Sequence, residues 1–194
     1  MANLSIFLSG SQNTETKIQN AVFIAPPVLD FFPEATASAN ITVSGIASKK
    51  QTVNLYINDE LTNTAVADNN GKFVFKEVLN PGENTVKTKA VVNNKESDFS
   101  NILTISFKNA PPSLNITSPS DNQSFSKDQN TAVIKGTTDA DVKVIVNGFW
   151  AIVDDSGNFS YTLSLQNGDN HIKIVATDPA GNKNEKEVKV NYSP

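Results

Sequence analysis

Few side chains in this protein have the type and spacing that catalysis needs. The single histidine, His171, directly follows the run Gly168-Asp169-Asn170 and, in the alternation of a strand, faces away from Ile172. A Ser-His-Asp triad would require this histidine, and no nucleophile elbow accompanies it. Acidic residues lie mostly in turn-like stretches, where Asp serves turn geometry. We therefore predict no catalytic residue, and we expect His171 to be an exposed strand residue.

Aspartates gather near the predicted loops of the second half of the chain, which raises the question of a metal site. They are Asp139, Asp141, Asp154, Asp155, Asp169 and Asp178. Calcium needs several converging oxygen ligands, but the run 154–157 lacks the alternate spacing of a calcium loop and has no downstream glutamate. The segment 107–112 carries no carboxylate, and the absence of cysteine excludes thiolate ligands and disulfides. The sequence therefore predicts no metal site and no cofactor.

One pair of aromatic residues stands beside a predicted turn. Phe149 and the only tryptophan, Trp150, follow Asn147-Gly148, and they are the candidate ligand contacts of the chain. If they are exposed, they could stack on a sugar ring or anchor a protein partner. If they are buried, they form a lid on the open end of a sandwich, which is the interpretation that we favour because large aromatics are mostly buried.

The elements that position these residues occur twice. Gly71-Lys72-Phe73 returns as Gly157-Asn158-Phe159, 86 positions later, and other pairs keep the same offset. A constant offset of this size indicates two copies of one domain, since solenoid units repeat every ~20–50 residues. The residues expected to hold turns and core are Gly71, Phe73, Gly82, Ala90, Gly157, Phe159, Gly168, Ala176, Asp178 and Gly181. We predict an N-terminal segment over 1–25 that is partly linker, a first domain over 26–109 and a second over 110–194.

Within each copy, apolar residues alternate with polar ones at a period of two. Val53, Leu55 and Ile57 show this pattern, and we align them with Val142, Val144 and Val146. Alternation of this kind is typical of half-buried strands, and Gly, Asn and Pro punctuate the runs as turns. The chain is therefore predicted to be all-β, with two tandem immunoglobulin-like β-sandwiches of about seven strands each.

Composition excludes several classes of partner. The chain has 16 basic residues, all lysine, and a net charge of −4. The absence of arginine and of any lysine-rich run argues against nucleic acid. No apolar run is long enough to span a bilayer. The N-terminus has two interpretations: a cytosolic chain as written, or the soluble part of a protein whose export or anchor segment is missing. We favour the second, and hence an extracellular or cell-surface location.

The second copy carries a motif that resembles a known family. The run Asp155-Ser156-Gly157-Asn158-Phe159-Ser160, then Gly168-Asp169-Asn170 and Ala176-Thr177-Asp178-Pro179-Ala180-Gly181-Asn182, resembles bacterial Ig-like domains of the glucodextranase type. These are short cysteine-free modules of secreted bacterial enzymes and surface proteins. The first copy departs from the pattern, because Asn93-Asn94-Lys95-Glu96-Ser97 stands where the family has Asp-x-Ala-Gly-Asn.

The resemblance implies a non-catalytic module, since the matching residues serve core and turns. We expect a stalk, spacer or adhesive module of a surface or secreted protein. The alternative is a carbohydrate- or protein-binding module that uses Phe149 and Trp150. Its partner would be a cell-surface protein or a polysaccharide. We further expect a monomeric, elongated rod, held straight by the extended backbone that Pro111-Pro112 favours and indifferent to calcium.

Overall fold

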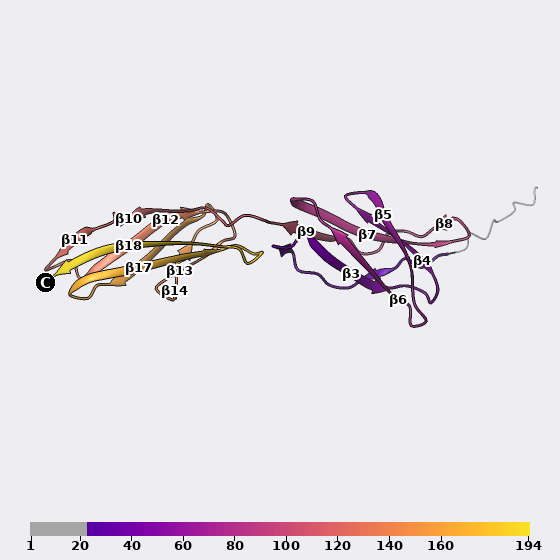
Figure 1. The fold of residues 1–194 in the computed structure, drawn as a ribbon, viewed down its shortest axis with the longest axis horizontal. Coiled ribbons are helices and arrows are strands. Elements are labelled where there is room, and N and C mark those ends of the chain that lie inside the picture. Colours follow the sequence, from indigo (N-terminus) through magenta and orange to yellow (C-terminus); the bar gives the residue numbers. More distant parts are fainter. Residues whose placement is uncertain (1–22) are drawn as a thin grey trace, which may run out of the picture.

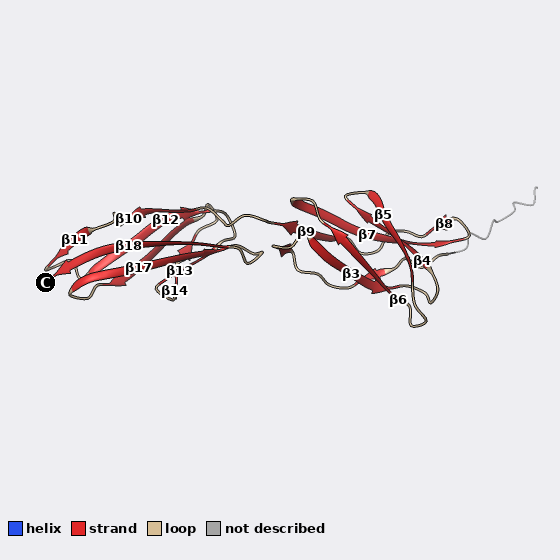
Figure 2. Ribbon diagram, viewed as in Figure 1, coloured by secondary structure: helices blue, strands red, loops and turns tan. Residues whose placement is uncertain are grey.

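The computed structural model describes residues 23–194, and all of its regular elements in that range are β-strands (Figure 2). Most of the predicted N-terminal segment therefore lies outside the described residues. Phe23, at the start of the described range, is exposed. The described chain forms two β-sandwiches arranged end to end along the long axis, joined by one crossing of the chain (Figure 1).

The first sandwich contains nine strand segments. They are β1 (Val28–Leu29), β2 (Ala35–Thr36), β3 (Asn40–Ile46), β4 (Thr52–Ile57), β5 (Glu60–Val66), β6 (Lys72–Val78), β7 (Gly82–Val92), β8 (Lys95–Glu96) and β9 (Leu103–Phe107). One sheet has the order β1-β3-β6, and the other has the order β2-β9-β7-β4-β5, with β8 paired to β7. Pairing is antiparallel throughout, except that β2 runs parallel to β9.

The second sandwich also contains nine segments. They are β10 (Leu114–Ser118), β11 (Gln123–Ser126), β12 (Thr131–Thr138), β13 (Lys143–Val146), β14 (Phe149–Trp150), β15 (Ile152–Val153), β16 (Asn158–Ser164), β17 (Gly168–Thr177) and β18 (Lys183–Ser193). The sheets have the orders β10-β12-β16-β15 and β11-β18-β17-β13-β14. Strand order and pairing follow the plan of the first sandwich, except that β15 pairs with β16 as a fourth strand and that no counterpart of β8 is present within residues 114–193.

Each sandwich encloses its own core, built from the inward residues of both its sheets. Val53, Leu55 and Ile57 point inward from β4, while Val144 and Val146 point inward from β13. The prediction of an all-β fold with two immunoglobulin-like sandwiches is confirmed. The segment count of nine rather than about seven arises because five segments, three in the first sandwich and two in the second, are two residues long.

The shared glycine and phenylalanine positions meet in the same way in both copies. Gly157 has φ of +79°, and a Cβ there would lie 2.1 Å from the carbonyl oxygen of Thr138. The ring of Phe159 lies on the backbone of Gly136, where an added Cβ would come within 2.4 Å of the ring tip. Gly45 and Phe73 repeat this contact in the first sandwich. The Gly45 and Gly136 pair is not among the residues singled out from sequence.

The other residues that were expected to hold turns and core lie at equivalent positions in the two sandwiches. Ala90 and Ala176 are fully buried, and Asp178 is 6% exposed. Positive φ angles occur at Gly71, Gly82, Gly168 and Gly181. Gly82 and Gly168 have open space where a Cβ would stand, so backbone conformation alone favours glycine there.

One alignment inferred from sequence is wrong by two residues. Val53 lies opposite Ala90 in the first sandwich, whereas Val144, not Val142, lies opposite Ala176 in the second. The strand before the hairpin is thus two residues shorter in the second copy. Because side chains alternate with a period of two, a shift of two keeps every residue on its own face and leaves the alternation unchanged.

Candidate functional site

The first candidate region is the junction between the sandwiches, where side chains of the second sandwich hold the connecting chain. The Asn182 side-chain amide donates a hydrogen bond of 2.9 Å to the carbonyl of Lys108. The Asn184 side-chain amide donates one of the same length to the carbonyl of Pro112. Pro112 itself is buried. Both ends of the five-residue linker 108–112 are therefore fastened to the second sandwich, one by Asn182 just before β18 and one by Asn184 within it.

The turn between β17 and β18 orients Asn182. The buried carboxylate of Asp178 accepts the backbone N–H of Asn182 at 2.8 Å and its side-chain amide at 3.0 Å. The same amide reaches Lys108, so the family motif Asp-x-Ala-Gly-Asn forms a turn and a linker contact at once. This second role is invisible in the sequence, because the linker lies 74 positions before Asn182.

Ser113 anchors the other side of the junction. Its backbone N–H donates to Asp139 Oδ2 at 2.9 Å, and its hydroxyl donates to Asp139 Oδ1. Its carbonyl accepts the hydroxyl of Thr138 at 2.6 Å. The hydrogen bonds from Ser113 hold the pKa of Asp139 below its ordinary value of 3.8. Asp139 thus holds the start of the second sandwich in place.

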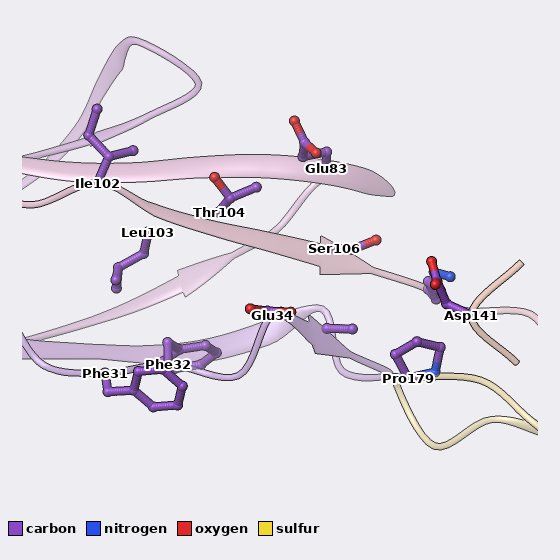
Figure 3. Close-up of a pocket in the computed structure, with 12 residues that line it drawn as sticks. Phe31, Phe32, Glu34, Glu83, Ile102, Leu103, Thr104, Ser106, Asp141 and Pro179 are labelled. Carbon is purple, nitrogen blue, oxygen red and sulfur yellow. The ribbon is translucent and has the colours of Figure 1, made fainter. Parts of the chain in front are cut away.

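A groove of about 570 Å³ opens beside this junction (Figure 3). Phe31 and Phe32 lie at one end, and Asp141 and Pro179 of the second sandwich lie at the other. Glu34 and Glu83 also border the groove, so carboxylates from distant parts of the chain reach a junction whose own linker carries none. Within residues 23–194, however, no three His, Asp or Glu side chains gather closely enough to hold a metal ion.

The second candidate region is the edge formed by β14. The side chain of Phe149 is 60% exposed and that of Trp150 is 63% exposed. The lid interpretation of this pair is therefore wrong: the core of the second sandwich is formed by other side chains, and the short edge strand β14 holds both rings outside it.

The turn before these aromatics is common to both copies. Asn147 and Asn58 both have positive φ, and each side chain accepts a backbone N–H from the neighbouring strand, that of Lys173 at 2.7 Å and that of Thr85 at 2.9 Å. The residues that follow differ, because Glu60 and Leu61 of the first copy stand where the second has aromatics. Only the aromatic pair is particular to the second sandwich.

The two aromatic rings face different surroundings. Phe149 stacks on Tyr161 with ring centroids 6.2 Å apart and planes 10° from parallel, so it bridges the edges of the two sheets. Trp150 lies directly opposite Ile145, whose neighbours Val144 and Val146 point into the core. Trp150 therefore belongs to the outer face of its sheet.

His171 is an exposed strand residue, as predicted. Its Nδ1 atom lies 2.6 Å from Glu187 on β18, and both side chains are more than half exposed. Lys173 and Glu185 form a similar pair at 2.7 Å. Pairs of this kind stabilise a fold by at most about 1 kcal/mol. Among residues 23–194 there is no helix long and apolar enough to cross a bilayer.

Comparison with known proteins confirms the resemblance of the second copy. Residues 112–193 match the family described as "Glucodextranase, domain B". Bacillopeptidase F of Bacillus subtilis (strain 168) is 35% identical over 160 residues, which is 81% of this chain. That stretch is longer than either sandwich, so the similarity includes both. The chain spans 11% of the length of bacillopeptidase F. It is thus similar to Ig-like modules of bacterial enzymes.

Solved structures with related architecture come from diverse sources. The fibronectin(III)-like modules of Clostridium thermocellum CbhA superpose with a TM-score of 0.49 at 17% identity, covering 90% of this chain and 92% of that one. Immunoglobulin domains 1–4 of Sidekick-1 give 0.45 at 12% identity, covering 87% and 49%. The fold assignment rests on the strand order described above.

Proposed function

We propose that this chain is a non-catalytic spacer within a larger secreted or cell-surface bacterial protein, and that its work is to hold neighbouring parts at a set distance and angle. The similarity to modules of bacterial enzymes, over a small part of one such enzyme, supports this role and an extracellular location. Each sandwich has its own hydrophobic core and short loops, as a rigid spacer requires. We propose further that the chain is monomeric.

The observation that carries the proposal is the fastening of the linker. Asn182 and Asn184 each hold a linker carbonyl, and Asp178 fixes Asn182 in the orientation that this requires. Two such bonds, with the fixed φ of Pro111 and Pro112, restrict rotation between the sandwiches. A spacer needs this restriction, because a free hinge would let the distance between its ends vary widely.

The test is a distance distribution between the two sandwiches. Spin labels on exposed positions of each, Asn63 and Ser164, report the distance by pulsed electron paramagnetic resonance on the full chain. We expect a narrow distribution in the parent protein and a broader one in Asn182→Ala/Asn184→Ala. The control is Asn191→Ala, an exposed residue of the same strand far from the linker.

Small-angle scattering on the same samples gives the overall shape. We expect an elongated two-body profile that calcium leaves unchanged, because the carboxylates near the junction do not form a metal-binding group. A compact globular profile would overturn the spacer proposal. An equally narrow spin-label distribution in the double variant would show that the asparagines do not set the geometry.

A second candidate function is that of a binding or adhesive module, and the exposure of Phe149 and Trp150 favours it. Exposed aromatics with a polar rim are typical of contacts with polysaccharides and proteins. The fold tolerates this addition, since the preceding turn is common to both sandwiches. The partner in this case is a cell-surface polysaccharide or protein.

A further inference from the structure

The outer face of the sheet β11-β18-β17-β13-β14 carries a row of apolar side chains. Trp150 lies opposite Ile145, Ile145 opposite Val175, and Val175 opposite Glu185. Directly opposed residues of antiparallel strands share a face and lie close together. Ile145 and Val175 are half-buried, and Trp150 is mostly exposed. We name Trp150, Ile145 and Val175 the apolar row.

The first sandwich shows that the fold does not require this row. Counted from the shared turn, its matching positions are Leu61, Tyr56 and Lys87; counted from the register around Ala90 and Ala176, they are Thr64, Asn54 and Lys89. In the set counted from Ala90 all three side chains are polar: the hydroxyl of Thr64 donates to Asn54 at 2.9 Å, and Lys89 pairs with Glu96 at 2.9 Å. Two copies of one domain with equivalent cores thus differ at all three positions. In either count a lysine stands at the position of Val175 and no tryptophan is present, so the complete row occurs in the second sandwich only, which favours binding over folding as its explanation.

Charges border the apolar row, and several of them pair with one another. On the side toward Gly168, Lys173 pairs with Glu185 at 2.7 Å and His171 lies 2.6 Å from Glu187. On the other side the next residue along β13 is Lys143, opposite Thr177. A surface whose acidic and basic groups neutralise one another attracts neither strong anions nor strong cations. The same groups can still donate and accept hydrogen bonds.

We infer that this face binds a neutral saccharide chain, with a pyranose ring stacked on Trp150 and further rings lying along Ile145 and Val175. The inference rests on the second candidate function above and names its ligand. Sugar rings have an apolar face of C–H groups and a rim of hydroxyls, which suits an aromatic ring beside paired charged groups. Protein interfaces commonly bury about 800 Å² on each partner, far more than three side chains in a row provide.

Phe149 is not part of the proposed site. It stacks on Tyr161 at the junction of the two sheets, whereas the register places Trp150 on the outer face. Phe99 provides a contrast on the outer surface of the first sandwich. Its ring is covered by Lys87, with Nζ 4.1 Å from the ring centroid, and by Lys89 at 4.5 Å. An aromatic covered in this way cannot offer its face to a sugar.

The experiment titrates the full chain with cellohexaose, maltohexaose and chitohexaose, and with polygalacturonate as a charged probe. Tryptophan emission reports the parent protein, because Trp150 is the only tryptophan, and calorimetry reports every variant. We expect saturable binding of at least one neutral hexasaccharide. Trp150→Ala should weaken it by about tenfold or more, since one aromatic contact accounts for roughly that factor.

Variants taken from the first sandwich sharpen the test. Val175→Lys introduces into the apolar row the lysine that the first sandwich has at position 89. We expect this variant to bind the saccharide severalfold more weakly and to keep nearly the same melting temperature. Phe99→Ala is the matched aromatic control and should bind as the parent protein does. Circular dichroism melts confirm that each variant is folded.

Three outcomes would overturn the inference: no binding of any neutral hexasaccharide, binding that survives Trp150→Ala, or a preference for polygalacturonate. A concentration-dependent dimer that buries Trp150 would also overturn it, since the face would then join two copies of this chain. The spacer proposal is judged separately, because spin-label distances and scattering do not depend on the apolar row.

Discussion

In the second sandwich β17 pairs with one continuous strand, β18, over ten residues, whereas in the first sandwich the matching partner is interrupted. There β7 pairs with β9 over five residues and with β8 over two. In the gap, Ser97 and Ser100 accept the backbone N–H groups of Ala90 and Thr88, at 2.9 and 3.0 Å. Two hydroxyls thus take over hydrogen bonds that a regular strand would have made.

Because the segments before the last strand differ, their asparagine side chains bind different parts of the chain in the two sandwiches. In the first, Asn101 bonds both backbone groups of Leu29, at 2.8 and 3.2 Å, and so fixes a strand of its own sandwich. In the second, the tight turn beginning at Asp178 aims Asn182 at the linker outside the sandwich. Equivalent cores therefore accommodate different final strands, and in the second sandwich the turn before the final strand also places a side chain on the linker.

The largest expected effect tests whether the two cores are independent. Phe159 is 2% exposed and packs on Gly136, so Phe159→Ala should lower the stability of the second sandwich by about 3–5 kcal/mol. Phe73→Ala should do the same to the first. Urea unfolding checks this, with Trp150 emission reporting the second sandwich alone and circular dichroism reporting both.

Each substitution should move one transition and leave the other in place. If Phe73→Ala shifts the Trp150 transition as much as Phe159→Ala does, the sandwiches unfold as one unit. A loss below roughly 1 kcal/mol for either variant would mean that the ring does not fill the core.

Much of this architecture follows from sequence, because period-two alternation and repeated turn glycines report local geometry. Gly157 and Phe159 lie where the repeat predicted. The two-residue shift of β13 was not predicted, since a shift by an even number of residues leaves the alternation of apolar and polar residues unchanged. The exposure of Trp150 was also not predicted, because large aromatic residues are mostly buried. The sequence did contain evidence for an apolar outer surface, since Ile145 and Val175 both stand at outward-facing positions of their strands. The bonds from Asn182 and Asn184 join residues more than 70 positions apart, and no local pattern encodes them.

A smaller effect tests the interrupted strand. Ser100 is 9% exposed and its hydroxyl accepts the buried N–H of Thr88, so Ser100→Ala leaves a donor without a partner. We expect a loss of about 1–3 kcal/mol in the first sandwich and none in the second. Calorimetric melts check this, with Ser164→Ala, on an exposed position of β16, as the control. An unchanged first transition would show that the backbone bond from Ser100 to Thr88 suffices by itself.

The smallest effect concerns acid and the junction. Hydrogen bonds from Ser113 hold the pKa of Asp139 below 3.8 in the folded protein, so the carboxylate contributes stability at neutral pH. This contribution is complete above the pKa of the unfolded chain and is lost as the pH falls through the lower folded pKa. Asp139→Asn should therefore destabilise the second sandwich at pH 7 by less than about 1 kcal/mol, because exposed contacts are screened by solvent. The difference from the parent protein should shrink as the pH falls below the ordinary aspartate pKa of about 4, and it should disappear once the parent carboxyl is protonated in the folded protein. Trp150 emission during urea unfolding at a series of pH values measures this directly. A difference that persists after the parent carboxyl is protonated would mean that Asp139 acts through shape rather than charge, and the first sandwich should not respond to the substitution at any pH.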